Sequence, residues 1–257
     1  MTGPGGAPAP ESAHPLVSFV LPAYNEEARL PAGLDRVLAF LGAQDFHSEV
    51  LVCDDGSRDR TPDIVREYGM HAPPALRVGL LQHEKNQGKG AAIRTAMLAA
   101  SGDYIFFMDA DLATPPEESL KLLERLRTGV AVAAGSRIQP DGSDMRASQP
   151  FKRRLVGRLF TKMRKLMRVV PDIDDTQCPM KGFSHQAAQA IFQRQRLAGW
   201  IFDAEVLFIA RALGYEIAEV PVRWSHVEGS RLRLRPQQAW EVLRDLLRLR
   251  LSRPRVS

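Results

Sequence analysis

Short apolar runs alternate with amphipathic stretches along the first half of the chain. Leu16–Leu21 is the first apolar run, and in the stretch Glu26–Leu41 leucine and valine recur at the spacing of one helix face. The same alternation predicts further strands at Glu49–Cys53, Arg77–Leu81, Tyr104–Met108 and Val130–Ala134, and further helices near Thr61–Tyr68, Gly90–Ala100 and Pro116–Arg127. Strands that alternate with helices are typical of an α/β fold, so we expect a mostly parallel sheet with helices on both faces.

Polar side chains gather where three of the predicted strands end. They follow the first strand as Tyr24-Asn25-Glu26, the second as Asp54-Asp55-Gly56-Ser57 and the fourth as Asp109-Ala110-Asp111. In an open α/β sheet, ligands bind beyond the carboxyl ends of the strands. The three clusters therefore predict one shared binding site at this edge of the sheet.

Asp109 and Asp111 are the candidates for a metal site. Two carboxylates one residue apart at a strand end can share a hard divalent cation, Mg²⁺ or Mn²⁺, while a diphosphate supplies further oxygen ligands. Since Asp is also a common turn residue, a solvated turn is the alternative for this motif taken alone.

The cluster after the first strand predicts contacts with a nucleotide. In Pro22-Ala23-Tyr24, the tyrosine ring can stack against a base, and Glu26 can reach ribose hydroxyl groups. The alternative is a plain helix start with Asn25 as the capping residue.

The cluster after the second strand predicts further contacts with the same ligand. Asp54 can accept a hydrogen bond from a base N–H group, and Asp55 can support the ribose or the metal ligands. A strand-to-helix turn is the alternative. Lys89, flanked by glycines at a helix start, is suited to an anion, although its motif has neither the spacing nor the final Ser/Thr of a Walker A loop.

Composition narrows the classes of protein that need to be considered. The chain has 257 residues, of which 44% are hydrophobic and 25% charged, and this excludes collagen-like and wholly disordered proteins. Cys53 and Cys178 are its two cysteines, so nothing requires an oxidising compartment. No apolar run approaches the ~18 residues that span a bilayer. Residues 1–15 are expected to form a disordered leader, and the protein is expected in the cytoplasm.

The ordered set PAYNEE, DDGS, NQGKG, DAD and GSR resembles family 2 glycosyltransferases of the Rossmann-like GT-A fold. The motifs of the second half, DTQCPMKGF (Asp175–Phe183), FDAEVLFIA (Phe202–Ala210) and VEGSRL (Val227–Leu232), resemble dolichyl-phosphate β-glucosyltransferases. The resemblance implies one glycosyltransferase domain over residues 16–251, with a nucleotide-sugar half (16–137), an acceptor half (138–251) and a tail (252–257). Ala110 would then lie in the nucleotide-sugar site, and the donor would be UDP-glucose.

The reaction implied is a metal-dependent, inverting transfer of a hexose to a polyprenyl phosphate. A phosphate monoester already presents an anionic oxygen at neutral pH, so charge compensation is needed more than a general base. Asp111 is expected to act in catalysis through the metal, while Asp203 and Glu205 position cations or the acceptor, with a base role for Asp203 left open. Arginines suit a phosphate because of their planar fork, and the candidates are Arg137, Arg153, Arg154 and Arg231.

Charge is divided unequally between the halves of the chain. Residues 1–151 contain 14 Lys and Arg against 20 Asp and Glu, whereas residues 152–257 contain 21 against 10. Lys152–Arg168 holds eight basic residues and no acidic one, and its apolar residues recur at helical spacing. We expect this helix to lie on an anionic membrane surface, and the C-terminal helix containing Trp240 and Leu251 either to do the same or to cover the core.

Two alternatives remain at this point. A glycosyltransferase that acts on a small alcohol or sugar acceptor would need no lipid. A non-catalytic nucleic-acid-binding protein would explain the basic second half, but the basic stretches contain few aromatic residues and the acidic clusters would repel a phosphate backbone, so no nucleic-acid partner is expected.

Overall fold

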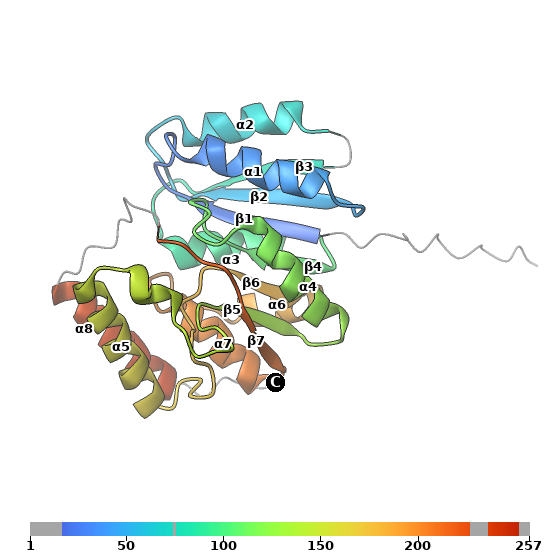
Figure 1. The fold of residues 1–257 in the computed structure, drawn as a ribbon. Coiled ribbons are helices and arrows are strands. Elements are labelled where there is room, and N and C mark those ends of the chain that lie inside the picture. The colour runs from blue at the N-terminus through green and yellow to red at the C-terminus, as the bar shows by residue number, and fades with distance from the viewer. Residues whose placement is uncertain (1–16, 74–75, 227–235, 252–257) are drawn as a thin grey trace, which may run out of the picture.

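The computed structural model describes residues 17–73, 76–226 and 236–251. It contains a seven-stranded sheet in the order β3-β2-β1-β4-β6-β5-β7 (Figure 1). The expected leader, the tail and Arg231 lie outside the described residues. The strands are β1 (Val17–Ala23), β2 (Ser48–Asp54), β3 (Leu76–Gln82), β4 (Tyr104–Phe107), β5 (Val132–Ser136), β6 (Lys181–Ser184) and β7 (Ile217–Pro221).

The sheet is mostly parallel, as the strand–helix alternation predicts. Strands β3, β2, β1 and β4 run parallel to one another, and β5 pairs in parallel with β7. The exception is β6, which lies antiparallel to both of its neighbours, β4 and β5. The expectation of an α/β fold with a mostly parallel sheet is therefore confirmed.

Helices cover both faces of the sheet and bury a separate hydrophobic cluster on each. Alternate residues of β1 face opposite ways, so Phe19 and Leu21 join one cluster and Val20 the other. The first cluster lies under α1 (Leu30–Gly42), α2 (Thr61–His71) and α4 (Ser119–Arg127), and the second under α3 (Lys89–Ala99), α6 (His185–Phe192) and α7 (Phe202–Ala212). Helices α5 (Phe151–Leu166) and α8 (Pro236–Leu251) pack against the second cluster, and two short 3-10 helices, Pro116–Glu118 and Met145–Ser148, complete the elements.

Helix α1 begins at Leu30, later than the predicted start at Glu26. The intervening residues form turns because side chains after β2 hold their backbone: Ser57 Oγ accepts from the Asn25 N–H and Thr61 Oγ1 from the Glu26 N–H, each at 2.8 Å. Asn25 itself has a positive φ of 51°, which an α-helix does not accommodate. Contacts from distant residues therefore override the local helical pattern here.

Strand β5 also differs from its prediction, since it covers Val132–Ser136 instead of Val130–Ala134. Gly129, whose φ is 96°, follows the end of α4. The two residues after it lead the chain back to the sheet, so the strand begins only at Val132. The shift carries Ser136 to the end of the strand, and Arg137 follows it directly.

Helix α5 forms where the basic amphipathic stretch predicts a helix, but its charges are not all on the surface. Arg164 is fully buried, and its guanidinium donates to the backbone carbonyls of Val169, Val170 and Ile173. The expectation that all eight basic residues of Lys152–Arg168 face a membrane is thus wrong for Arg164. The physical reason is that carbonyl groups of the buried turn after α5 need hydrogen-bond donors, and the guanidinium supplies them.

Candidate active site

The three polar clusters lie at the same edge of the sheet. Because β1, β2 and β4 are parallel neighbours, their carboxyl ends coincide, and the register places Ala23 opposite Asp54. Asp109 and Asp111 follow β4 at this edge, and Lys89 begins α3 there. The structure therefore brings together residues that the motifs mark in three separate parts of the sequence.

Lys89 and the two aspartates form the centre of the candidate site. Lys89 Nζ lies 2.5 Å from Asp109 Oδ1. Burial opposes the charge of Lys89, but Asp109 and Asp203 more than compensate, so its pKa is raised. Burial, and after it the charge of Asp109, raises the pKa of Asp111. Asp203 therefore lies near enough to act on Lys89, although it comes from α7.

The donor set fits a divalent cation. Asp109 and Asp111 are carboxylates close enough to repel each other, and hard cations such as Mg²⁺ and Mn²⁺ prefer oxygen ligands. Among the residues that the structure describes, no group of three or more His, Cys, Asp and Glu could hold a metal. The protein would therefore supply these two carboxylates, and a bound diphosphate would supply further oxygen ligands.

Asp54 and Asp55 are both buried at the end of β2, and both accept hydrogen bonds from the backbone. Asp54 accepts from the Ser57 N–H, at 3.2 Å to Oδ2. Asp55 accepts from the N–H groups of Gln87 and Gly88 at 2.9 and 2.8 Å, and its Oδ1 lies 2.8 Å from His83 Nδ1. The contacts of Asp55 position the loop that leads into Lys89, a role that its motif does not reveal.

Tyr24 and Glu26 lie in the turns between β1 and α1. The Tyr24 side chain is exposed at the same strand edge, where a planar ligand can reach it. Glu26 pairs with Arg29 through two short contacts, from Nε to Oε2 at 2.7 Å and from Nη2 to Oε1 at 2.6 Å. This hydrogen-bonded pair raises the pKa of Arg29, on which the charge of Asp111 also acts.

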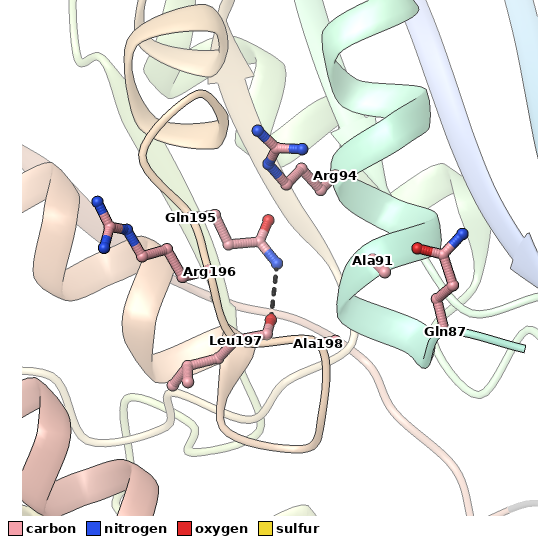
Figure 2. A pocket seen from close by; sticks show the side chains of 7 residues that line it. All are labelled: Gln87, Ala91, Arg94, Gln195, Arg196, Leu197 and Ala198. Carbon is pink, nitrogen blue, oxygen red and sulfur yellow. Dashed lines mark hydrogen bonds between the residues drawn. The ribbon is translucent and has the colours of Figure 1, made fainter.

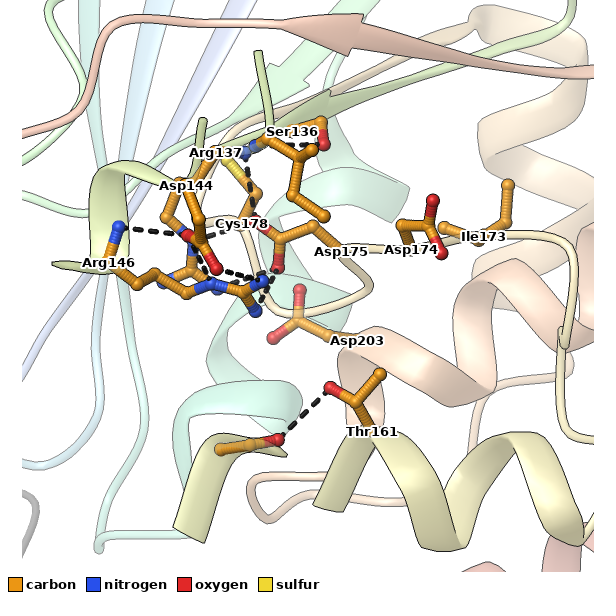
Figure 3. A network of polar contacts seen from close by, with 12 residues as sticks. Ser136, Arg137, Asp144, Arg146, Thr161, Ile173, Asp174, Asp175, Cys178 and Asp203 are labelled. Carbon is orange, nitrogen blue, oxygen red and sulfur yellow. Dashed lines mark hydrogen bonds and ion pairs between the residues drawn. The ribbon is translucent and has the colours of Figure 1, made fainter. Parts of the chain in front are cut away.

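Arg137 and Asp175 form a buried ion pair beside the site (Figure 3). The guanidinium donates from Nε and from Nη2 to the two carboxylate oxygens, each at 2.7 Å, and the Arg137 backbone N–H donates to Oδ2 at 2.9 Å. Burial alone would raise the pKa of Asp175, but the charge and hydrogen bonds of Arg137 lower it to about 2. The Trp224 ring covers the guanidinium at 5.5 Å. Two of the five guanidinium N–H groups of Arg137 are therefore used by Asp175.

Lys181 and Asp203 form a second buried pair. Lys181 Nζ lies 2.6 Å from Asp203 Oδ1 and 2.7 Å from the Cys178 carbonyl oxygen. Burial raises the pKa of Asp203, against the opposing effect of Lys181 and Lys89. Neither Lys181 nor Asp175 is among the predicted site residues, although both lie in the DTQCPMKGF motif. The available signal was that Asp175 and Lys181 are the two charged residues of this motif.

Glu205 binds backbone and not a cation. Its two carboxylate oxygens accept hydrogen bonds from the N–H groups of Arg196 and Leu197, at 3.0 and 2.7 Å. The carboxylate thereby fixes the loop between α6 and α7. That loop leads directly into Phe202 and Asp203.

Three of the arginines expected at an acceptor phosphate lie in the described part of the chain, and of these Arg153 is the one on which a metal-site carboxylate, Asp111, acts. Burial and then the like charge of Arg137 lower its pKa, while Asp111 attracts it. Arg153 thus lies within electrostatic reach of both Asp111 and Arg137. Arg154 is half-buried on the same helix, and Arg231 lies outside the described residues.

The sequence profile of Glycosyl transferase family 2 matches residues 18–192. The chain belongs to glycosyl transferase family 2. The chain is similar to dolichyl-phosphate beta-glucosyltransferases. It is 37% identical to the one from Drosophila melanogaster, over 90% of this chain and 73% of the relative. It is 34% identical to the human one, over 91% of this chain and 75% of the relative. The Dictyostelium discoideum relative is 33% identical over 84% of this chain and 68% of its own length. This chain therefore spans about two thirds to three quarters of the length of these relatives. The resemblance read from the motifs is confirmed.

The fold has solved counterparts. Glucosyl-3-phosphoglycerate synthase from Mycobacterium tuberculosis in complex with UDP superposes with a TM-score of 0.68 and 21% identity, over 95% of this chain and 81% of the other. The same synthase in complex with Mn²⁺, UDP-glucose and phosphoglyceric acid gives a TM-score of 0.64 and 20% identity, over 95% and 81%. These likenesses establish the GT-A-like fold of this glycosyltransferase.

Proposed function

We propose that this glycosyltransferase transfers glucose from UDP-glucose to a polyprenyl phosphate of the dolichyl type, with inversion at the sugar carbon. The single observation that carries the acceptor class is that Arg153 is a half-buried guanidinium on which the charges of both Asp111 and Arg137 act. An anion bound beside Arg153 would offset two unfavourable effects on its charge, the repulsion by Arg137 and the cost of burial. The similarity to dolichyl-phosphate beta-glucosyltransferases at 33–37% identity supports the same acceptor.

The donor would be bound by the strand-edge residues. Tyr24 would stack on the uracil, Asp54 would accept a hydrogen bond from it, and Glu26 would reach the ribose. Lys89, at the first turn of α3, would bind the diphosphate together with the helix N-terminus. The neighbour of the same fold that was solved with Mn²⁺ and UDP-glucose supports this choice of donor and cation.

Asp109 and Asp111 would hold Mg²⁺ or Mn²⁺, which neutralises the charge that develops on the leaving diphosphate. On the acceptor side, Arg153 would orient the phosphate so that one of its oxygens attacks the anomeric carbon. No general base is required, because a phosphate monoester is largely dianionic at pH 7. Asp203 is held by Lys181 and would keep Lys89 and the loop before α7 in position.

Arg137 is assigned a supporting role at the acceptor. Its side chain is paired with Asp175, so it would contribute positive potential and fix the chain after β5 more than it would grip the phosphate directly. This is a narrower role than the one expected from the GSR motif. The electrostatic effect of Arg137 on Arg153 supports this role.

The lipid would reach the site along helix α5. Phe151, Leu155, Leu159 and Leu166 are all exposed and recur every four or seven residues, which places them on one side of the helix. Arg158 and Lys162 are exposed on the same helix. An anionic membrane surface would therefore suit both the exposed apolar side chains and the exposed basic side chains of α5. Among the described helices, none is long and apolar enough to cross a membrane. The enzyme would therefore contact the membrane peripherally through α5.

The experiment that tests the acceptor offers a short-chain polyprenyl phosphate and its dephosphorylated alcohol side by side, in detergent, with UDP-glucose and Mn²⁺. We expect transfer to the phosphate alone. Equal transfer to both would show that the phosphate is not the nucleophile, and an alcohol acceptor would take its place.

The variant Arg153→Gln tests the residue that carries the proposal. It should leave UDP binding nearly unchanged by calorimetry and lower kcat/KM for the polyprenyl phosphate by at least about tenfold, since it removes a charge-assisted contact. Arg158→Gln, an exposed arginine of the same helix, is the matched control. Arg153→Gln with undiminished transfer would remove Arg153 from the acceptor site.

A further inference from the structure

His83 is a buried histidine to which the proposed function gives no role. It directly follows the last residue of β3, and the register pairs that residue, Gln82, with Asp54 at the end of β2. The side chain of His83 is only 9% exposed. The polar clusters that the sequence marks follow β1, β2 and β4. His83 therefore adds a polar group from β3 to the same edge of the sheet.

Both ring nitrogens of His83 have partners, and these partners belong to different elements. Nδ1 lies 2.8 Å from Asp55 Oδ1, just after β2, and Nε2 lies 2.9 Å from Thr95 Oγ1, in the second turn of α3. An ionised carboxylate can only accept, so Nδ1 donates to Asp55, whereas the Thr95 hydroxyl can either donate to Nε2 or accept from it. The imidazole ring therefore bridges the end of β2 and the body of α3.

Asp55 holds the start of α3 as well. Its carboxylate accepts hydrogen bonds from the N–H groups of Gln87 and Gly88, the two residues before Lys89, at 2.9 and 2.8 Å. Gly88 has a φ of 103°, and a Cβ atom at this position would lie 2.6 Å from the carbonyl oxygen of Ala198. The backbone before Lys89 is therefore packed too closely to shift without breaking these contacts.

A second set of contacts holds the first turn of α3 against the loop between α6 and α7, which lies beside the N-terminal end of the helix (Figure 2). The Gly90 N–H donates to the Ala198 carbonyl at 2.8 Å. Gln195 Nε2 donates to the carbonyls of Gly90 and Leu197 at 2.9 and 3.0 Å. The position of Lys89 thus depends on contacts with this loop and on contacts with the end of β2.

We propose that His83 is a positioning residue for the donor diphosphate, a role that rests on the proposed function. Its ring holds α3 at a fixed distance from β2. The charge of Lys89 then meets the diphosphate while Asp54 meets the uracil of the same ligand. A displacement of α3 by as little as about 1 Å would prevent the two contacts from forming together.

Two substitutions separate the two contacts of the ring. His83→Gln keeps a nitrogen near the place of Nε2 and loses the contact with Asp55, whereas His83→Asn keeps one near Nδ1 and loses the contact with Thr95. Since Asp55 holds the residues before Lys89, His83→Gln should weaken UDP binding by at least about fivefold, measured by calorimetry with saturating Mn²⁺. His83→Asn should weaken it less. His71→Gln, which replaces an exposed histidine of α2, is the control.

Uridine distinguishes the positioning of Lys89 from general damage to the fold. It has the base and the ribose of UDP but no phosphate, so its affinity does not depend on Lys89. His83→Gln should therefore bind uridine within about twofold of the wild type in a ligand-detected NMR titration. Equal losses of affinity for uridine and UDP would show a general structural role and overturn the proposal.

A double-mutant cycle with Lys89→Met tests the path from the ring to the ligand. Because His83 is proposed to act through Lys89, His83→Gln should add little to the loss of UDP affinity that Lys89→Met causes alone. Losses that add fully would overturn this path. UDP binding that is unchanged in His83→Gln would overturn the role of His83 and leave the proposed function standing. Wild-type protein that binds no UDP would overturn both.

Discussion

Among the residues that the structure describes, two arginines are buried, and their partners differ. The Arg137 guanidinium faces a carboxylate, whereas that of Arg164 faces three backbone carbonyls and has its pKa lowered by burial. A buried charge costs several kcal/mol unless such partners satisfy it. Each guanidinium therefore donates hydrogen bonds to buried oxygen atoms, and these bonds help to hold the local course of the chain.

Arg164→Gln should destabilise the fold by at least about 2 kcal/mol, because the shorter side chain leaves the carbonyls of Val169 or Ile173 without their guanidinium donor. Urea denaturation followed by circular dichroism measures the change. Arg158→Gln, on the exposed side of the same helix, should stay within about 0.5 kcal/mol of the wild type. An equally small effect of Arg164→Gln would mean that water replaces the guanidinium.

The Asp175 carboxylate should make the fold sensitive to acid. Its pKa is lowered from 3.8 to about 2, so the ion pair stabilises the native state fully above pH 4, and this contribution falls as the pH drops toward 2. The loss amounts to about 2 kcal/mol. Unfolding free energies measured between pH 5 and 2 should show the slope in the wild type and a smaller slope in the double variant Arg137→Met, Asp175→Asn. Identical slopes would assign the acid sensitivity to other groups.

Asp111→Asn should lower kcat by at least two orders of magnitude while the melting temperature of the ligand-free protein stays similar. The substitution removes a carboxylate from the proposed metal site but keeps the size and shape of the side chain. Asp103→Asn, an exposed aspartate before β4, is the control. Full activity in excess chelator would contradict the proposed metal dependence.

At the scale of elements, α5 has two apolar sides with different tasks. Phe160, Met163 and Met167 pack against the core, whereas Leu159 and Leu166 are 63% and 85% exposed. The exposed side has no packing contribution to lose. Substitution of the exposed leucines should therefore affect membrane attachment and not folding.

The pair Leu159→Gln, Leu166→Gln should lower the fraction of protein that floats with anionic liposomes and leave the melting temperature within about 2 °C. Met163→Gln is the opposite case, because it should lower the melting temperature by several degrees. Salt should weaken liposome binding of the wild type without abolishing it, since burial of apolar side chains is not screened. Wild-type protein that stays at the bottom of the gradient in low salt would rule out the attachment.

The elements of the first half could be predicted from the sequence, because their strands are mostly apolar and their helices amphipathic. Proximity of Asp54 to Asp109 and Asp111 followed from the parallel arrangement of the strands. The second half was less accessible: β6 is short and contains Lys181 and Gly182, so its sequence has no strand periodicity. The pairs Arg137–Asp175 and Lys181–Asp203 join residues far apart in the chain, and no local pattern encodes which charge meets which.

For the whole molecule, ligand binding should be visible as thermal stability. Binding at 100 times Kd adds about 2.7 kcal/mol, which corresponds to about 5–10 °C for a protein of this size. UDP with Mn²⁺ should raise the melting temperature by this order, and either one alone should have less effect. Asp111→Asn should lose the part that depends on the metal. A wild-type melting temperature that does not respond to the pair would contradict the proposed donor site.

The position of β6 has a consequence for synthesis of the chain on the ribosome. β6 separates β4 from β5 in the sheet but follows both in the sequence, so both strands leave the exit tunnel before their shared neighbour β6 has been made. At about 5–20 residues per second, the edge of β4 waits roughly 4–15 s for Lys181–Ser184 to be made. During this time a nascent chain ending before β6 exposes an open, apolar strand edge. Chaperones that bind extended apolar segments should therefore capture stalled chains ending near residue 150 and release chains that include residue 184.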